Sequence, residues 1–259
     1  MKDLTPLINP ESVAVIGASR KHGKVGHTIL ANLVKDGFGG KIIPINPSGE
    51  KILGLDSYTS LSDYGSGVQL AIMVVPKESV LDAAKEAVRV GVEAMIVIAA
   101  GFRETGVYGA QLENELVELC KNYGVKLLGP NCLGIINTAL NLNASFATKL
   151  PVYGGLSVFS QSGALITSML DLAAERHLGI DKLVSVGNKA DITEIDLLRY
   201  FATDNQTKVV IGYLEDIASG DKFVKAAEEV SAVKPVIILK SGTTEAGLKA
   251  AASHTGVLA

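Results

Sequence analysis

One of the four histidines in the sequence has neighbours that suit covalent chemistry. His254 lies in the run Ser253-His254-Thr255-Gly256, where small polar residues leave an imidazole accessible and movable. An imidazole in that setting can attack phosphorus and carry a phosphoryl group covalently. Histidines are more often structural than catalytic, and His22, His27 and His177 receive the structural interpretation, although His22 could lie near the phosphates of a cofactor.

Glu215 directly follows the apolar run 208–214, which reads as a strand. A carboxylate at the carboxyl end of a parallel strand faces the side of the sheet where ligands bind. The alternative is a helix N-cap or a solvated acid in a loop. From the residues alone, both interpretations of Glu215 stay open.

A strand-to-helix turn at Ser160-Gln161-Ser162-Gly163 could bind phosphate. Ser160, Ser162 and Gly163 would offer hydroxyls beside the unpaired N–H groups of a helix N-terminus. Taken alone, a serine that caps its own helix is the commoner use of such a turn. The turn is not a G-x-S-x-G nucleophile elbow, because Ser160 stands where that motif has glycine.

A glycine-containing loop follows the first predicted strand and precedes a helix, from Gly17 to Gly26. Glycines let the backbone approach a ligand, and the helix N-terminus favours phosphate. Arg20, Lys21 and Lys24 add positive charge to this loop. The alternative is an ordinary strand-to-helix turn with solvated basic residues.

NAD is the first cofactor to consider for this loop, and two features disfavour it. Positions 18 and 19 are Ala and Ser, so the G-x-G-x-x-G spacing is absent. The second strand ends in Ile45-Asn46-Pro47-Ser48, without the acidic residue that binds the ribose hydroxyls. A basic loop without that acid suits coenzyme A, which carries more phosphate groups, and NAD becomes the second choice.

Further loops follow predicted strands in the first half, at 75–77, 99–102 and 129–134. Asn131 could simply cap a turn, and Cys132 could be a small buried apolar residue. No base near Cys132 in the sequence suggests a nucleophile. We predict that the coenzyme A-type cofactor contacts the following residues: Gly17, Ser19, Arg20, Lys24, Val74, Pro76, Asn131 and Cys132.

Short β-branched runs alternate with longer helical patterns and position these loops. Strands are expected at 12–16, 41–45, 70–74, 94–98 and 125–128, and again at 156–160, 182–186, 208–214 and 235–240. Continuously apolar strands separated by helices predict parallel sheets covered on both faces, the doubly wound α/β arrangement. A polar stretch at 137–155 separates the two groups. We predict a Rossmann-like domain at 1–148 and a flavodoxin-like domain at 149–259, with the second incomplete at its C-terminal end.

Composition excludes several classes of function. The chain of 259 residues has a net charge of -3 and no Trp, which disfavours general attraction to nucleic acid or anionic membrane. No apolar run approaches the length of a membrane span, and no N-terminal signal core is present. Cys120 and Cys132 form neither a metal-type spacing nor a disulfide framework. A cytoplasmic protein is expected.

Several sequence blocks together resemble the α part of ADP-forming (nucleoside-diphosphate-forming) acetyl-CoA synthetases, a family related to succinyl-CoA synthetase. The resemblance spans residues 7–259 and rests on these blocks: 13–19, 129–134, 160–164, 185–191, 213–215 and 253–256. It implies a CoA-binding Rossmann-like domain followed by a flavodoxin-like ligase domain. It also implies the reaction acyl-CoA + ADP + phosphate ⇌ acid + CoA + ATP, which proceeds through an acyl phosphate and a phosphohistidine.

The resemblance assigns the phosphohistidine to His254, the acid that steadies it to Glu215, and a phosphate-binding turn to Ser160–Gly163. It implies a partner, an ATP-grasp β subunit or domain that binds Mg-ADP or Mg-ATP, and hence a hetero-oligomer. Acetate as the acyl group is a family-level expectation. A CoA-binding regulatory module without turnover, as found in protein acetyltransferases, is the alternative.

Overall fold

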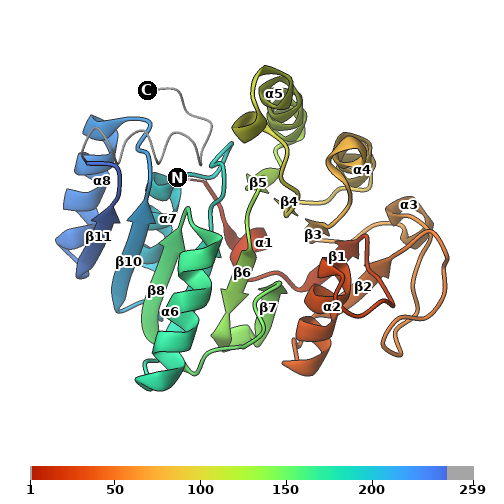
Figure 1. Cartoon of the computed structure of the whole chain (residues 1–259), viewed down its shortest axis with the longest axis horizontal. Helices are drawn as coiled ribbons and strands as arrows, with labels where there is room; N and C mark the ends of the chain where they lie inside the picture. Colours follow the sequence, from red (N-terminus) through yellow and green to blue (C-terminus); the bar gives the residue numbers. More distant parts are fainter. Residues whose placement is uncertain (1, 244–259) are drawn as a thin grey trace.

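The computed structural model describes residues 2–243 and places two α/β sheets side by side (Figure 1). The first sheet is parallel throughout, in the order β2-β1-β3-β4-β5. Its strands are β1 (Ser12–Ile16), β2 (Lys41–Ile45), β3 (Leu70–Met73), β4 (Ala94–Val97) and β5 (Lys126–Leu128). The helices of this half are α1 (Thr5–Ile8), α2 (Val25–Lys35), α3 (Leu61–Tyr64), α4 (Lys77–Arg89) and α5 (Val107–Tyr123), with a 3-10 turn η1 (Arg103–Thr105).

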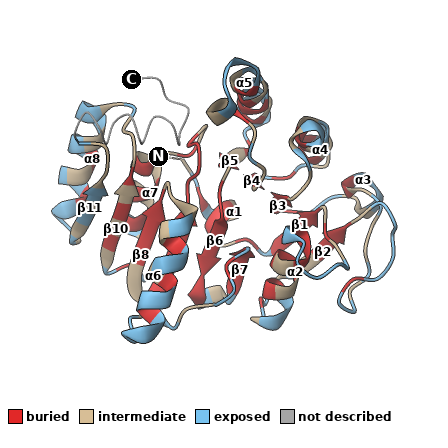
Figure 2. Cartoon of the chain, in the orientation of Figure 1, coloured by how far each residue is buried: buried red, intermediate tan, exposed pale blue. Residues whose placement is uncertain are grey.

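Both faces of the first sheet are buried, as its apolar strands predict. Successive side chains of a strand point to opposite faces, so β1 serves two cores. Val13 and Val15 pack on the side of α2, whereas Ala14 and Ile16 pack on the side of α4 and α5. Strands β1, β3 and β4 are buried along their length, and the outer helix surfaces are exposed (Figure 2).

The second sheet has the order β11-β10-β8-β9-β6-β7. Its strands are β6 (Gly134–Asn137), β7 (Leu142–Ser145), β8 (Tyr153–Ser160), β9 (Ile180–Ser185), β10 (Val209–Leu214) and β11 (Val236–Lys240). The helices are α6 (Gly163–Glu175), α7 (Glu194–Thr203) and α8 (Gly220–Ser231), with a 3-10 turn η2 (Thr138–Leu140). Strands β8 to β11 are parallel, and β6 joins β9 antiparallel. The two predicted α/β sheets are confirmed.

The hairpin of β6 and β7 is absent from the sequence-based prediction, which has a polar stretch over much of it. Its polar side chains are buried and satisfied internally: Asn143 donates to Asp36 at 3.0 Å, and the Ser145 hydroxyl donates to Asn143 at 2.6 Å. Asn32 of α2 donates to the Ser145 carbonyl at 2.8 Å. The hairpin therefore ties the second sheet to the first half. The chain passes from the first sheet to the second between β5 and β6. The division into domains between residues 148 and 149 stays a prediction.

One apolar core runs through both halves. It includes Val15 of β1, Phe159 of β8 and Phe201 of α7, and the N-terminal helix α1 contributes Leu7 and Ile8. The two halves therefore pack as one body around this core.

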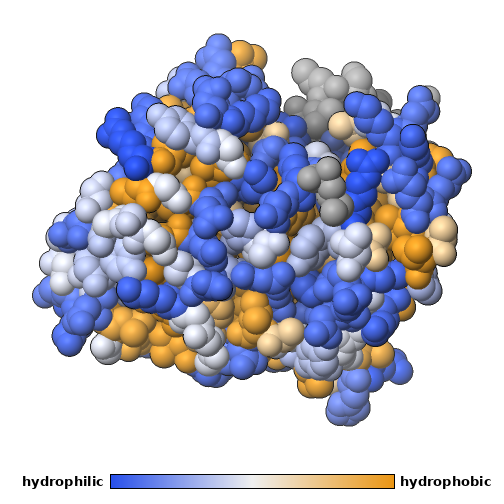
Figure 3. Space-filling view, turned by 180° about the vertical axis from the view of Figure 1, so that it is seen from behind, coloured by the Kyte–Doolittle hydropathy of each residue, from blue (hydrophilic) through white to orange (hydrophobic). Residues whose placement is uncertain are grey.

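Polar side chains cover most of the rear surface, with apolar patches between them (Figure 3). Within residues 2–243, no helix has both the length and the apolar character needed to cross a bilayer.

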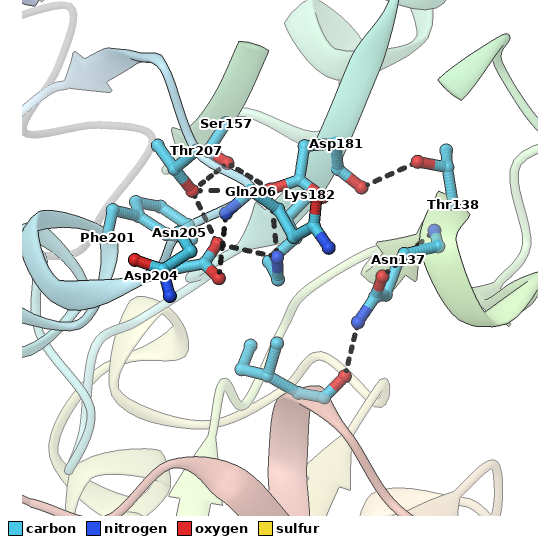
Figure 4. A network of polar contacts seen from close by, with 12 residues as sticks. Asn137, Thr138, Ser157, Asp181, Lys182, Phe201, Asp204, Asn205, Gln206 and Thr207 are labelled. Carbon is cyan, nitrogen blue, oxygen red and sulfur yellow. Dashed lines mark hydrogen bonds and ion pairs between the residues drawn. The ribbon is translucent and has the colours of Figure 1, made fainter. Parts of the chain in front are cut away.

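A buried polar network stabilises the amino end of the second sheet (Figure 4). Lys182 Nζ lies 2.8 Å from Asp181 Oδ2 and 2.6 Å from Asp204 Oδ2, and its side chain is 3% exposed. Thr207 donates to the Asp204 carboxylate at 2.6 Å, and Ser157 donates to Asp181 at 3.2 Å. Burial raises the pKa of Asp181, and Lys182 offsets this only in part. The positive charge of Lys182 therefore offsets the cost of placing the Asp181 and Asp204 carboxylates next to each other.

We predict that Lys182→Met lowers the free energy of unfolding by about 3–5 kcal/mol, because it leaves buried carboxylates unpaired. The matched control is Lys149→Met, which removes an exposed pair with Asp171 and should cost less than about 1 kcal/mol. Urea unfolding of the two variants measures both effects. Equal losses in the two variants would contradict the role given to Lys182.

Candidate active site

A cavity of about 870 Å³ lies where the carboxyl ends of the two sheets meet. The first half lines it with Gly17, Ala18, Ser19, Lys24, Val25, Gly26, Asn46, Val74, Val75, Pro76, Ile98, Ala99, Arg103, Asn131, Cys132 and Leu133. The second half adds Phe146, Gln161, Ser162, Gly163, Ala164, Gly187, Asn188 and Glu215. Most of these residues lie in loops that follow parallel strands, which is where α/β sheets bind ligands.

Most of the residues predicted from the sequence line this cavity. These are Gly17, Ser19, Lys24, Val74, Pro76, Asn131, Cys132, Ser162, Gly163 and Glu215. Arg20 is not among the lining residues; its guanidinium pairs with Glu50 on the surface. Ser160 is fully buried. His254 lies outside the described residues. The binding and catalytic roles of all these residues stay predictions.

The β1–α2 loop brings the backbone unusually close to its neighbours. Gly17 has φ +91°, and a Cβ there would lie 2.5 Å from the Val74 carbonyl oxygen. A Cβ on Gly26 would lie 2.1 Å from the Gly17 carbonyl oxygen. Only glycine fits at both positions, so the start of α2 lies directly against β1 and faces the cavity.

Three helices in the described part of the chain begin at the cavity. Lys24 and Pro76 precede α2 and α4, and neither side chain caps its helix. Ser162 precedes α6, and its hydroxyl accepts a hydrogen bond from Leu165 N at 3.2 Å. The capping alternative for Ser162 therefore holds. Helix N-termini carry partial positive charge, so their convergence favours a ligand with several anionic groups.

The buried Ser160 hydroxyl stabilises the turn through two hydrogen bonds. It accepts a hydrogen bond from Ser162 N at 3.0 Å and donates one to Ser162 O at 2.9 Å. Because this hydroxyl is buried and engaged by the backbone, it shapes the turn that presents Ser162 and Gly163 to the cavity.

Gln161 joins that turn to the loop that carries Glu215. Its side-chain oxygen accepts hydrogen bonds from Glu215 N at 2.7 Å and Asp216 N at 3.1 Å. Its amide nitrogen donates to the Asp216 carboxylate. The turn after β8 and the acid after β10 are thus held at a fixed separation.

Lys189 also anchors the loop that carries Glu215, through contacts with Asp216. Its Nζ lies 3.0 Å from Glu194 Oε2 and 3.1 Å from Asp216 Oδ1, and it donates to the Asp216 carbonyl at 2.8 Å. Burial alone would raise the pKa of Asp216. The charge of Lys189 and the hydrogen bonds from Gln161 and Lys189 outweigh burial, so that pKa lies below its ordinary value.

Asn188 connects the two halves at the cavity wall. Its side-chain nitrogen donates to Glu104 Oε2 at 2.7 Å and Glu113 Oε2 at 2.8 Å. Its backbone nitrogen donates to Pro130 O at 2.9 Å, and its carbonyl accepts from the Arg103 guanidinium. This loop of the second sheet is therefore fastened to the loops of the first.

Cys132 lines the cavity but is not an activated thiol. Burial raises its pKa to about 12, and its Sγ donates to Val97 O at 3.4 Å. A thiol that stays protonated is a poor nucleophile. The structure agrees with the absence of a nucleophilic role for Cys132 in the sequence analysis.

Sequence reasoning missed four residues of the site: Arg103, Gln161, Asn188 and Lys189. Gln161, Asn188 and Lys189 lie in sequence blocks on which the family resemblance rests. The resemblance therefore pointed to the loops of these residues but assigned no role to the side chains. Arg103 follows the loop 99–102 by one residue, and nothing in its local sequence marks it. Its placement depends on contacts between distant segments.

Two family models match the chain. A CoA binding domain matches residues 11–138, and a succinyl-CoA ligase like flavodoxin domain matches residues 153–259. A curated relative, the acetate–CoA ligase [ADP-forming] of Methanocaldococcus jannaschii, is 50% identical over 96% of this chain and 35% of its own length. The chain therefore combines a CoA binding domain with a succinyl-CoA ligase like flavodoxin domain.

Two further similar proteins give the same picture. The acetate–CoA ligase [ADP-forming] I subunit alpha of Pyrococcus furiosus is 42% identical over 99% of this chain and 56% of its own length. A solved acetyl-coenzyme A synthetase 1 from Ca. Korarchaeum cryptofilum, in complex with phosphate and ADP, is 42% identical with a TM-score of 0.95. It is covered over 56% of its length and covers all of this chain. The chain thus spans about a third to a little over half of these relatives.

We predict that the contribution of Asp216 to stability depends on pH. A carboxyl group whose pKa is lowered by folding stabilises the protein above its unfolded pKa, and this stabilisation is lost as the pH falls through the folded pKa. Asp216→Asn should therefore reduce the free energy of unfolding at neutral pH, and the deficit should shrink below the ordinary aspartate value of 3.8. Urea unfolding from neutral pH to about pH 2 measures the difference. A deficit that stays constant over this range would contradict the assignment.

Proposed function

We propose that this chain is the α part of an ADP-forming acyl-CoA synthetase and that its cavity converts acyl-CoA and phosphate into acyl phosphate and CoA. One observation carries the proposal: the glycine loop after β1 and the serine turn after β8 line the same cavity. A CoA ester held by the first sheet and a phosphate held at the second would meet there.

The first half fits a ligand with several phosphates. Lys24 and the uncapped N-terminus of α2 supply positive charge beside Gly17 and Gly26, where a Cβ would collide with backbone. The cavity volume of about 870 Å³ is large for a small-molecule or cofactor site, which suits a ligand of the size of CoA. The match to a CoA binding domain supports CoA over NAD.

The first proposed step is an acyl transfer. A phosphate oxygen attacks the thioester carbonyl carbon, the carbon–sulfur bond breaks, and CoA leaves as a thiolate that takes up a proton. The N-terminus of α6, presented by Ser162 and Gly163, would bind the phosphate and stabilise the negative charge that develops.

The second proposed step moves the phosphoryl group. A nitrogen of the His254 imidazole attacks phosphorus, the bond between phosphorus and the acyl oxygen breaks, and the carboxylate leaves. Glu215 would fix the tautomer of the ring and stabilise its positive charge. The last described residues support this arrangement, because Ser241 N donates to Leu214 O at 2.9 Å and so brings the chain beside Glu215.

The phosphohistidine would then pass its phosphoryl group to Mg-ADP on an ATP-grasp subunit or domain, in the cytoplasm. Two facts support such a partner: the relatives are longer than this chain, and the one from Pyrococcus furiosus is named a subunit alpha. Acetate is the proposed acyl group, as in the names of these relatives.

Radiolabelled acetyl phosphate tests the relay without the partner. We predict acid-labile, base-stable label on the wild-type chain and a loss of at least about a hundredfold in His254→Asn, because the nucleophile is absent. His177→Asn is the matched control: His177 is exposed at φ 54°, a conformation that Asn tolerates, and its labelling should equal wild type. Unchanged labelling of His254→Asn would refute the relay and favour a CoA-binding module without turnover.

A further inference from the structure

Arg103 contributes a positive charge to the cavity from the first half of the chain. It begins η1, its side chain lines the cavity, and that side chain is 28% exposed. Among the described lining residues, Lys24 is the other cationic side chain and Glu215 the acidic one. The two cations come from different loops, after β1 and after β4.

The guanidinium of Arg103 is held from behind. Its Nε lies 3.5 Å from Glu113 Oε1, and another guanidinium nitrogen donates to the Asn188 carbonyl. The Glu113 side chain is 6% exposed and accepts a hydrogen bond from Asn188 Nδ2 at 2.8 Å. An arginine fixed in this way loses little further side-chain entropy when it binds a ligand.

The contacts place Arg103 toward the second half of the cavity. It bonds to Asn188, in the loop after β9, and its charge contributes to the lowered pKa of Asp216 beside Glu215. Lys24, by contrast, belongs to the loop beside Gly17 and Gly26. The acids around the guanidinium are Glu104, Glu113 and Asp216, and Asn188 or Lys189 engages each of them.

We infer that Arg103 binds the reacting phosphate group in the second half of the cavity, as inorganic phosphate before acyl transfer and as the phosphoryl group of the acyl phosphate afterwards. This inference rests on the proposed function. The planar guanidinium can form two parallel hydrogen bonds to phosphate oxygens, and the α6 N-terminus lies along the same cavity. During acyl transfer one phosphate oxygen bonds to carbon, and Arg103 retains hold of the remaining oxygens as the CoA thiolate leaves.

Calorimetric titration of the chain with inorganic phosphate, acetyl phosphate and CoA separates the possible ligands. Arg103→Met should raise the dissociation constants of phosphate and acetyl phosphate by about tenfold to a hundredfold, the range expected for hydrogen bonds to a charged group. Arg103→Lys keeps the charge without the fork and should fall between Met and wild type. The dissociation constant of CoA should stay within about twofold of wild type, since Lys24 and α2 are intact.

Two further variants test whether the loss of any arginine, or the negative charge left on Glu113, explains the result. Arg199→Met removes a surface arginine that pairs with Glu229, and it should bind phosphate as wild type does. Arg103→Met leaves the buried Glu113 carboxylate without its counter-ion, so the double variant Arg103→Met/Glu113→Gln removes that negative charge as well. The double variant should retain the wild-type melting temperature and still bind phosphate weakly.

The outcomes separate this inference from the proposed function. Wild-type affinity for phosphate in the folded Arg103→Met variant, no binding of phosphate by wild type, or a loss confined to CoA would each overturn the inference. Failure of His254 labelling with a phosphate affinity that still depends on Arg103 would remove the relay and leave the anion site standing. Normal labelling of His254, with a phosphate affinity that does not depend on Arg103, would support the relay and overturn the role of Arg103.

Discussion

The cavity depends on how Asn188 fastens the loop after β9 to the loops of the first sheet. Its amide and backbone contact Glu104, Glu113 and Pro130, and its carbonyl accepts from Arg103. The residue before it, Gly187, approaches so closely that a Cβ would lie 2.2 Å from the Pro130 carbonyl oxygen. A larger residue at 187 would force the two halves apart. The backbone contact at Gly187 and the hydrogen bonds of the Asn188 amide therefore set the separation of the two halves at the cavity.

This fastening determines the electrostatics of the site. The N-termini of α2, α4 and α6 and the side chains of Lys24 and Arg103 face a shared space, which Glu215 also lines. Charges that are held in place before a reaction need no reorganisation while it occurs, which is how enzymes stabilise charged transition states. Gln161 and Lys189 extend the same principle to the loop that carries Glu215. The arrangement suits a ligand with several anionic groups.

Much of this could be predicted from the sequence, because local patterns determine it. The strands 12–16 and 41–45 match β1 and β2 residue for residue, and parallel strands bring their carboxyl-end loops to one edge. The hairpin of β6 and β7 was missed because its polar side chains are buried and make long-range hydrogen bonds, such as the one from Asn143 to Asp36. The positive charge of Arg20 led to the prediction that it contacts the cofactor, whereas in the structure its guanidinium pairs with Glu50 on the surface. Arg103 and Asn188 acquire their roles from each other, 85 positions apart, which no local pattern encodes.

The most direct test of this account is a crystal structure of the chain with phosphate and a ketone analogue of acetyl-CoA, in which a methylene group replaces the thioester sulfur. We expect the CoA portion to lie along the β1–α2 loop and phosphate to lie between Arg103 and the Ser162–Gly163 turn. A phosphate oxygen should approach the acyl carbon to about 3–3.5 Å, the distance of a near-attack geometry. An analogue bound with its acyl end outside the cavity, or a phosphate bound away from both Arg103 and the turn, would contradict it.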